Sequence, residues 1–217
     1  MNFSVHIPLD AQPEQLERLA ALQRAVAEVC NALAPIVRET RCWNRVGLHH
    51  LAYRSLRERF PQVGSQMVCN AIYSVSRTCR LLFQHPQSPF NVARHPDKPL
   101  PQLQFQPSLP VYFDRHTLSV KVGQLSMYTL DGRMKFQLNL TDADVQRFKE
   151  NKLREIVLIQ TPDGYRLSFT FADPQAGEDE NADASLDASG DLPEYVLVSE
   201  ESPSPHPTAE TAQSASM

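Results

Sequence analysis

The sequence has few glycines and none of the loops that bind phosphates or carry a nucleophilic serine. It holds 7 Gly against 17 Pro in 217 residues, and neither GxGxxG nor GxxxxGK[ST] occurs in it. These loops cradle the phosphates of dinucleotides and nucleoside triphosphates, so neither class of protein is supported. The GxSxG elbow of the α/β-hydrolases is also absent. We therefore expect a protein that is not an enzyme and that carries no cofactor.

The cysteines lack the spacing of a metal or redox motif. Cys30, Cys42, Cys69 and Cys79 include no CxxC pair, and three of them fall in apolar helical patterns. Because free cysteine is among the most buried residue types, we expect reduced, structural thiols.

No apolar run approaches the roughly 18–20 residues that span a bilayer. The apolar residues from Leu16 to Leu33 are interrupted by charged ones, so the first 30 residues do not resemble a signal peptide. We expect a cytoplasmic protein with no membrane partner.

Candidate metal ligands are few. His49 and His50 are adjacent, and neighbouring side chains on a helix point about 100° apart, so both rings cannot bind one ion. Asp114 and Asp163 are the acids next to predicted strands, and Asp163 is already accounted for by a turn. We predict no metal site and no metal-dependent cleavage of nucleic acid.

Basic residues are missing from the C-terminal part of the chain. Residues 1–172 hold all 21 Lys and Arg against 14 Asp and Glu, a net charge of +7, whereas residues 173–217 hold 11 acids, a net charge of −11. A basic body favours partners that carry phosphate. The remainder has too few apolar residues to offset chain entropy, which predicts a disordered acidic tail over 173–217.

One segment of this tail is apolar, Leu192 to Val198 (LPEYVLV). It is either a docking peptide for a protein partner, a transient strand, or an incidental apolar patch in a linker.

The N-terminal region predicts a strand followed by a helix. Phe3 to Leu9 alternates apolar and polar side chains, as a half-buried strand does. Asp10 is a candidate helix cap, and apolar residues then recur at helical spacing. We expect Pro35 to end or kink this helix, because proline removes a backbone donor and clashes with the preceding turn.

Two more helices follow a polar connector over 38–45. Apolar residues at helical spacing predict one helix from Leu48 to Phe60 and another from Ser65 to Leu82. Between Pro86 and Pro110 the density of proline excludes a helix or a central strand, so this stretch is expected to be an extended connector.

The pattern then changes to short segments rich in β-branched and aromatic residues, which predict strands. They are Val111–Phe113, Leu118–Val122, Leu125–Leu130, Met134–Leu140, Ile156–Gln160 and Tyr165–Phe171. Gly132 and Gly164 supply the positive φ of hairpin turns, and Thr141 begins a short helix through Phe148. The fold class is α+β, with the first strand free to join the later sheet.

Arginines and aromatic residues gather in the helical region, off the apolar stripes. Guanidinium groups bind phosphate oxygens and aromatic rings stack on bases, so the cluster predicts a nucleic-acid surface, and a solvated helix face is the alternative. The candidate binding residues are Arg38, Arg41, Arg45, Arg54, Arg57, Asn70, Tyr73, Arg77 and Arg80.

The order of these signals resembles the N-terminal part of TnpB, the RNA-guided nuclease of some insertion sequences, which is related to type V CRISPR effectors. The resemblance lies in FSVHIPLDAQPEQLERL, a helix carrying Asn31, LHHLAYRSLRERFPQVGSQMVCNAIYSVSRTCR, and LSVKVGQLSMYTLDGRMKFQLNL, within residues 3–171. It implies a β-barrel-like wedge domain formed by the first and later strands, and an inserted helical recognition lobe that contacts guide RNA and target DNA. A TnpB protein would continue into a RuvC-like nuclease domain, and here the acidic tail follows instead.

The resemblance implies a discontinuous β-barrel-like domain with an inserted three-helix lobe and a disordered acidic tail. The expected divisions are a first strand (1–10), a helical lobe (11–85), a Pro-rich connector (86–107), the remaining strands (108–172) and the tail (173–217).

We expect a non-catalytic, transposon-associated protein that binds structured RNA, an RNA–DNA hybrid or DNA. The alternatives are a protein-interaction or regulatory module, with Leu192 to Val198 docking a partner, and a binding subunit for a separately encoded nuclease.

Overall fold

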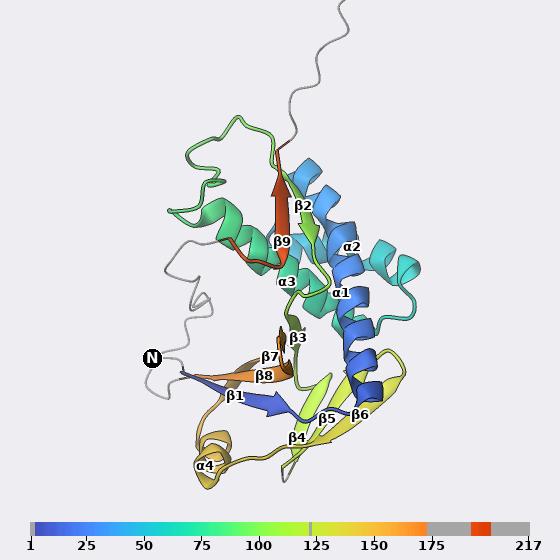
Figure 1. Cartoon of the computed structure of the whole chain (residues 1–217). Coiled ribbons are helices and arrows are strands. Elements are labelled where there is room, and N and C mark those ends of the chain that lie inside the picture. The colour runs from blue at the N-terminus through green and yellow to red at the C-terminus, as the bar shows by residue number, and fades with distance from the viewer. Residues whose placement is uncertain (1–2, 122, 173–191, 201–217) are drawn as a thin grey trace, which may run out of the picture.

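The computed structural model describes residues 3–121, 123–172 and 192–200. Three helices gather on one side of the molecule and most of the strands on the other (Figure 1). The helices are α1 (Pro13–Thr40), α2 (Arg45–Arg59) and α3 (Ser65–Gln84), and a short fourth helix, α4 (Asp142–Glu150), lies beside the strands. The mixed α+β class predicted from the sequence is therefore confirmed.

The start of α1 differs from the expected cap at Asp10. The helix begins at Pro13, and the Gln12 N–H donates to the Gln15 side chain at 2.9 Å. Pro13 occupies the first helical position, where a missing N–H leaves no hydrogen bond unmade.

Pro35 does not end α1, so this part of the prediction is wrong. The helix continues to Thr40, and residues 38–40 of the expected connector form its last turn. Proline inside a helix costs about 3 kcal/mol. Leu33 and Val37 are fully buried while the proline ring faces solvent, and this packing offsets the cost.

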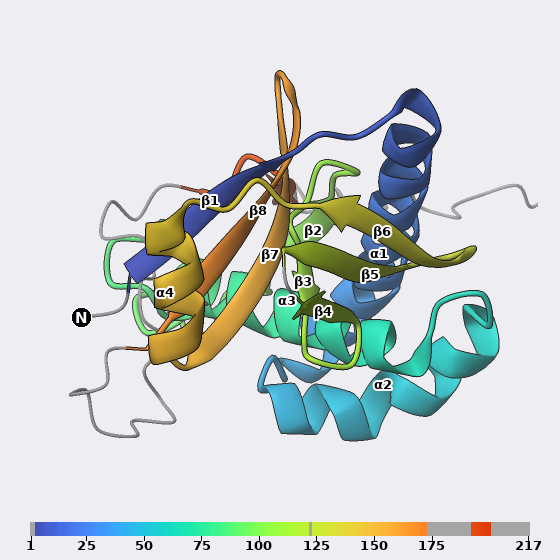
Figure 2. The same cartoon turned by 90° about the horizontal axis from the view of Figure 1, so that it is seen from below.

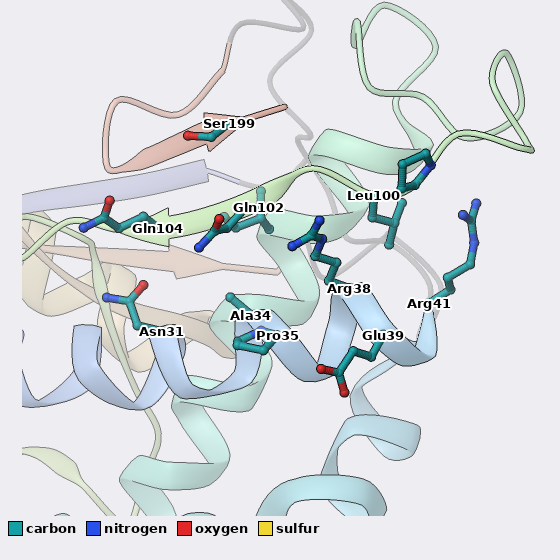
Figure 3. Close-up of a pocket in the computed structure, with 12 residues that line it drawn as sticks. Asn31, Ala34, Pro35, Arg38, Glu39, Arg41, Leu100, Gln102, Gln104 and Ser199 are labelled. Carbon is teal, nitrogen blue, oxygen red and sulfur yellow. The ribbon is translucent and has the colours of Figure 1, made fainter. Parts of the chain in front are cut away.

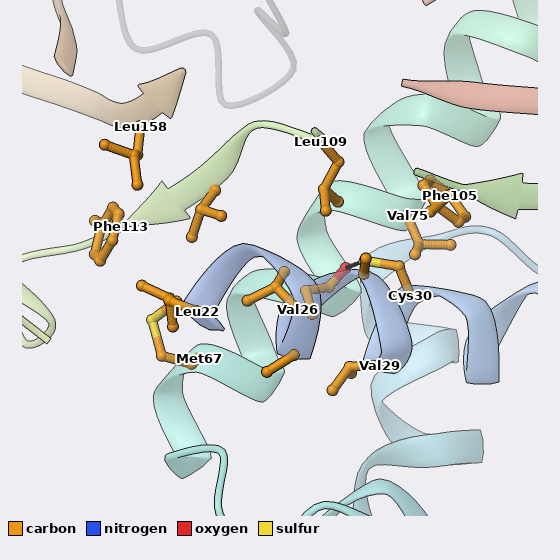
Figure 4. Close-up of a cluster of buried hydrophobic side chains, with 14 of the residues drawn as sticks. Leu22, Val26, Val29, Cys30, Met67, Val75, Phe105, Leu109, Phe113 and Leu158 are labelled. Atoms are coloured by element: carbon orange, nitrogen blue, oxygen red, sulfur yellow. Dashed lines mark hydrogen bonds between the residues drawn. The ribbon is translucent and has the colours of Figure 1, made fainter. Parts of the chain in front are cut away.

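α2 and α3 confirm the two predicted helices. Leu48, Ala52 and Leu56 of α2 pack into the core, and α3 buries most of its length. Figure 4 shows the centre of this core, where α1 and α3 meet residues from the strands and connector. Its members include Leu22, Val26, Val29, Met67, Val75, Phe105, Leu109, Phe113 and Leu158.

All four cysteines are free, as predicted. Cys30 and Cys79 are fully buried, and burial raises the pKa of both thiols. The Cys30 thiol donates to the Ala71 carbonyl across the α1–α3 contact, with a sulfur–oxygen distance of 3.8 Å. These two thiols act as packing groups.

The largest sheet is antiparallel with strand order β1-β8-β7-β3. Its strands are β1 (Phe3–Leu9), β3 (Val111–Phe113), β7 (Leu153–Thr161) and β8 (Gly164–Phe171). β1 pairs with β8 along its whole length, from Phe3 opposite Phe171 to Leu9 opposite Tyr165. The first strand thus joins the later strands as predicted, and the three helices are inserted between them in the chain.

A second sheet is the meander β4 (Leu118–Lys121), β5 (Gln124–Thr129) and β6 (Gly132–Gln137). Within the described residues the sheets do not close into a barrel, so this part of the expected fold is corrected. β3 and β4 fall into different sheets and are joined by a tight turn that begins at Asp114. Its carboxylate accepts hydrogen bonds from the Thr117 N–H and hydroxyl, at 3.0 and 2.8 Å.

The predicted hairpin turns and the short helix are present. Gly132 and Gly164 have φ of 99° and 129°, conformations that side chains disfavour. Thr141 caps α4, accepting from the Asp144 N–H at 3.2 Å. The Phe148 ring of α4 packs edge-on against Phe169 and Phe171 of β8, with α4 lying along the sheet in Figure 2.

A third sheet joins parts of the chain that the sequence had assigned elsewhere. β2 (Gln102–Phe105), inside the expected connector, pairs antiparallel with β9 (Val196–Ser199), inside the expected disordered tail. Residues 192–200 are therefore part of the fold, because alternate side chains of both strands reach the apolar core.

The other residues of the predicted tail, 173–191 and 201–217, lie outside the described residues. No helix in the described part of the chain has the length and apolarity needed to cross a membrane.

Candidate nucleic-acid interface

The most basic helix surface belongs to α2. Its sequence contains one acid, Glu58, and four arginines distributed around the helix, together named here the α2 basic face: Arg45, Arg54, Arg57 and Arg59. Asn44 caps the helix by accepting from the Gly47 N–H at 2.9 Å. Because α2 buries only three residues, most of its circumference meets solvent.

The arginines of the α2 basic face differ in their exposure and in the contacts of their side chains. The Arg54 side chain is 94% exposed and its pairing with Glu58 is a long 3.4 Å contact. Such exposed pairs contribute little to stability. Arg45 and Arg59 are exposed, and Arg59 lies over the Phe60 ring. Arg57 is half-buried and donates to the Val63 carbonyl, which ties α2 to the turn before α3.

The basic face extends toward Cys69 on α3. Burial raises the pKa of the Cys69 thiol, the charges of Arg45 and Arg57 oppose this rise, and that of Asp114 adds to it. The charges of Arg45 and Arg57 therefore act on the Cys69 thiol of α3.

Arg45 connects this face to a half-buried polar group, the Glu155 cluster, made of Tyr73, Arg77, Tyr112 and Glu155. Its guanidinium lies over the Tyr73 ring, 5.3 Å from the centroid. Glu155 of β7 accepts from the Tyr73 hydroxyl and from Arg77, both at 2.9 Å. Arg77 also lies over the Tyr112 ring at 5.8 Å.

The Glu155 cluster joins α3 to the largest sheet. The Arg77 and Glu155 side chains are 24% and 21% exposed, so their ion pair is partly shielded from water. Burial, reinforced by the Glu155 charge, raises the pKa of the Tyr73 hydroxyl, which donates to Glu155. The Glu155 carboxylate therefore holds the Arg77 side chain in place.

Two more predicted residues lie on α3 away from open solvent. Asn70 is buried and donates to the Tyr112 carbonyl at 3.0 Å, where it holds β3 against the helix. Arg80 is half-buried. We expected Asn70 and Arg77 to face solvent on α3. The structure instead buries Asn70 and pairs Arg77 with Glu155.

Arg38 and Arg41 lie apart from α2, at the end of α1. They line a groove of about 790 Å³ between α1, β2 and the end of β9, shown in Figure 3. Arg41 adopts a left-handed conformation with φ of 52° and donates to the Pro96 and Lys98 carbonyls at 3.2 and 3.0 Å. Arg41 thereby secures the proline-rich loop.

The structure thus divides seven of the nine predicted residues among three places, and Asn70 and Arg80 lie elsewhere on α3. Arg45, Arg54 and Arg57 lie on α2, Tyr73 and Arg77 lie next to Arg45, and Arg38 and Arg41 lie at the groove. Among residues 3–121, 123–172 and 192–200, no three His, Cys, Asp or Glu side chains gather where they could hold a metal ion.

No protein-family model matches this chain, and neither does any curated protein sequence.

Three residues of the site, Arg59, Tyr112 and Glu155, are not among the nine residues predicted from the sequence. Arg59 follows Arg57 on the same helix, and the criterion that selected its neighbours would have found it. Tyr112 and Glu155 come from strands, and no local spacing relates either of them to a helix far away in the chain.

Proposed function

We propose that the protein binds structured RNA or an RNA–DNA hybrid through the α2 basic face, without catalysing a reaction on it. The observation that carries the proposal is that α2 places four arginines and one acid on a helix with only three buried residues. Arginine forks match phosphate oxygens, and a solvent-facing helix can approach a nucleic-acid backbone.

The order of the elements adds support. β1 pairs with β8, and the helices are inserted between them, which is the order that the resemblance to TnpB implies. DNA as a second partner, and the association with a transposon, rest on that resemblance alone.

The test is binding of a fluorescein-labelled RNA hairpin, and of an RNA–DNA hybrid of the same sequence, measured by anisotropy over a range of KCl concentrations. We expect Arg54→Gln with Arg59→Gln to weaken binding and to lower the salt slope by about one for each phosphate that is no longer neutralised. These two arginines are chosen because both are exposed, whereas Arg57 and Arg77 also hold the fold.

The matched control is Arg147→Gln with Lys149→Gln on α4, which removes the same charge from another exposed helix. It should leave the salt slope unchanged. Equally weakened binding in the two double variants would mean that only net charge matters, and an unchanged affinity in the α2 variant would reject the interface.

A protein-interaction module is the second candidate, and a specific observation favours it. Val46 and Leu51 of α2 are 65% and 52% exposed, so each offers an apolar side chain that a partner protein would cover. If Val46→Ser with Leu51→Ser leaves RNA binding intact and the α2 arginines prove dispensable, this candidate becomes the better one.

A further inference from the structure

β2 is held in place by α1 and not only by its partner strand. The Asn31 side chain accepts from the Phe105 N–H at 2.7 Å and donates to the Phe105 carbonyl at 3.0 Å. Nearer the start of α1, the Gln23 side chain donates to the carbonyl of Leu109, which follows β2, at 3.0 Å. The Leu103 and Phe105 side chains are 5% and 2% exposed, so β2 is also packed into the core.

The opposite edge of β2 carries β9. The Gln106 N–H donates to the Tyr195 carbonyl at 2.8 Å, and the register places Gln104 opposite Leu197. Because backbone groups of an antiparallel strand alternate in direction, those of Gln102, Gln104 and Gln106 face β9 while those of Phe105 face α1. Removing β9 would therefore leave a preformed strand edge.

β9 is attached to this edge by few groups. Val196 is buried, Tyr195 and Val198 are half-buried, and the Tyr195 hydroxyl contacts that of Thr78 at 3.4 Å. Leu197 is 51% exposed. In the described part of the chain β9 pairs with β2 alone, and 24 residues separate it from the end of β8.

We propose that the edge of β2 is a docking site for an extended peptide of a partner protein, and that residues 192–200 occupy it within the same chain. The peptide carries an aromatic residue followed by aliphatic residues one and three positions later, the pattern of Tyr195, Val196 and Val198. Backbone hydrogen bonds to β2 supply affinity, and the buried positions supply specificity. This proposal does not depend on nucleic-acid binding.

The resident strand competes with any partner peptide. Tethering raises the local concentration of a segment to about the millimolar range, so β9 should weaken peptide binding about tenfold or more. A partner reaches the site when its peptide binds more tightly or when β9 is displaced.

The experiment uses the full chain and a fluorescein-labelled peptide with the sequence of residues 191–201, DLPEYVLVSEE, followed by anisotropy. Gln104→Cys with Leu197→Cys introduces a disulfide between two exposed, directly paired positions, in a background of Cys42→Ser and Cys69→Ser. Oxidation, verified by mass spectrometry, locks β9 onto β2. A second variant, Val196→Asp, disables the resident strand, and circular dichroism checks its fold.

We expect the peptide to bind Val196→Asp at least about tenfold more tightly than wild type, and to bind the locked chain only after reduction. A peptide carrying Tyr195→Ala and Val196→Asp should not bind. Equal binding to the oxidised and reduced forms of the locked chain would overturn the proposal. So would the absence of binding to the reduced lock and Val196→Asp up to about 1 mM, a concentration at which weak peptides are detected. A wild-type dimer in sedimentation that Val196→Asp abolishes would overturn it as well, by assigning the site to a second copy.

Discussion

Asn31 provides β2 with the hydrogen bonds that a neighbouring strand would otherwise make. A side-chain amide has one acceptor and one donor group in a suitable arrangement to pair with both backbone groups of a single residue. The pairing with Phe105 uses both, at 2.7 and 3.0 Å. An apolar residue at position 31 would leave a buried N–H and a buried carbonyl without partners.

We therefore expect Asn31→Ala to lower the free energy of unfolding by about 1–3 kcal/mol. Urea denaturation followed by circular dichroism measures the change. Asn139→Ala, at an exposed position in the same chain, is the control and should change stability by about 0.5 kcal/mol or less. Equal effects in the two variants would show that the amide pairing contributes nothing.

Two half-buried tyrosines, Tyr112 and Tyr195, predict a loss of stability at high pH. Burial raises the pKa of Tyr112 and, to a smaller extent, of Tyr195. Above about pH 10 the unfolded chain releases phenol protons that the folded chain retains, so stability falls as pH rises. We expect Tyr112→Phe to flatten this decline between about pH 9 and 11, because it removes the most strongly shifted group. A decline as steep as that of wild type would contradict this account.

The candidate site was predictable only where exposure follows from helix geometry. Arg54 lies opposite the apolar residues of α2, and its spacing alone indicates that it is exposed. Arg77 also lies away from the main stripe of α3, but a carboxylate 78 residues later in the chain pairs with it. A helix pattern says nothing about such a distant partner.

At the scale of the element, local patterns predicted the strands and helices with strong periodicity. α3 begins at the expected Ser65, and the meander has its expected turns, because each is specified by neighbouring residues. The prediction at Pro35 was wrong because the burial of Leu33 and Val37 outweighs the local cost of a proline inside a helix. β2 was missed, and β9 was predicted only as one alternative for Leu192 to Val198, because each strand has four residues and the surrounding prolines or acids dominate its local composition.

The cap of α4 gives a prediction for a single element. The Thr141 hydroxyl donates to the Asp144 carboxylate at 2.7 Å, and this hydrogen bond is the main reason that the pKa of Asp144 is lowered. Thr141→Ala should cost about 1 kcal/mol of unfolding free energy, and Thr141→Ser, which keeps the hydroxyl, should cost less. Urea denaturation measures both.

The cap should also respond to pH. A lowered pKa in the folded state stabilises the fold above about pH 4 and loses this effect as the carboxylate is protonated. The difference between wild type and Thr141→Ala should therefore shrink in acid. A difference that is constant from pH 7 to 3 would place the effect of Thr141 elsewhere.

At the scale of the whole molecule, the separation of charge suggests competition between the C-terminal acids and nucleic acid. Residues 173–191 contain seven acids, and the pairing of β9 with β2 fixes the end of this stretch to the body. Acidic residues tethered to the body compete with phosphate for its arginines.

Replacing Glu178, Asp179 and Glu180 by their amides should therefore tighten RNA binding at low salt. The gain should disappear near 0.5 M KCl, where charges farther apart than about 4–5 Å are screened. Anisotropy titrations at both salt concentrations measure it. Glu14→Gln with Glu17→Gln and Glu28→Gln, on α1, is the control that removes the same net charge, and an equal gain there would remove the special role of the C-terminal acids.

The pairing of β1 with β8 also sets the order in which the molecule can form during synthesis. Phe3 is made before its partner Phe171, which follows 168 residues later in the chain. The contacts between α1, α2 and α3 become available much earlier, and local contacts form faster than distant ones. The nascent chain would therefore carry β1 as an unpaired strand beside an assembled helical lobe, and its apolar residues would be exposed to chaperones until β8 is complete.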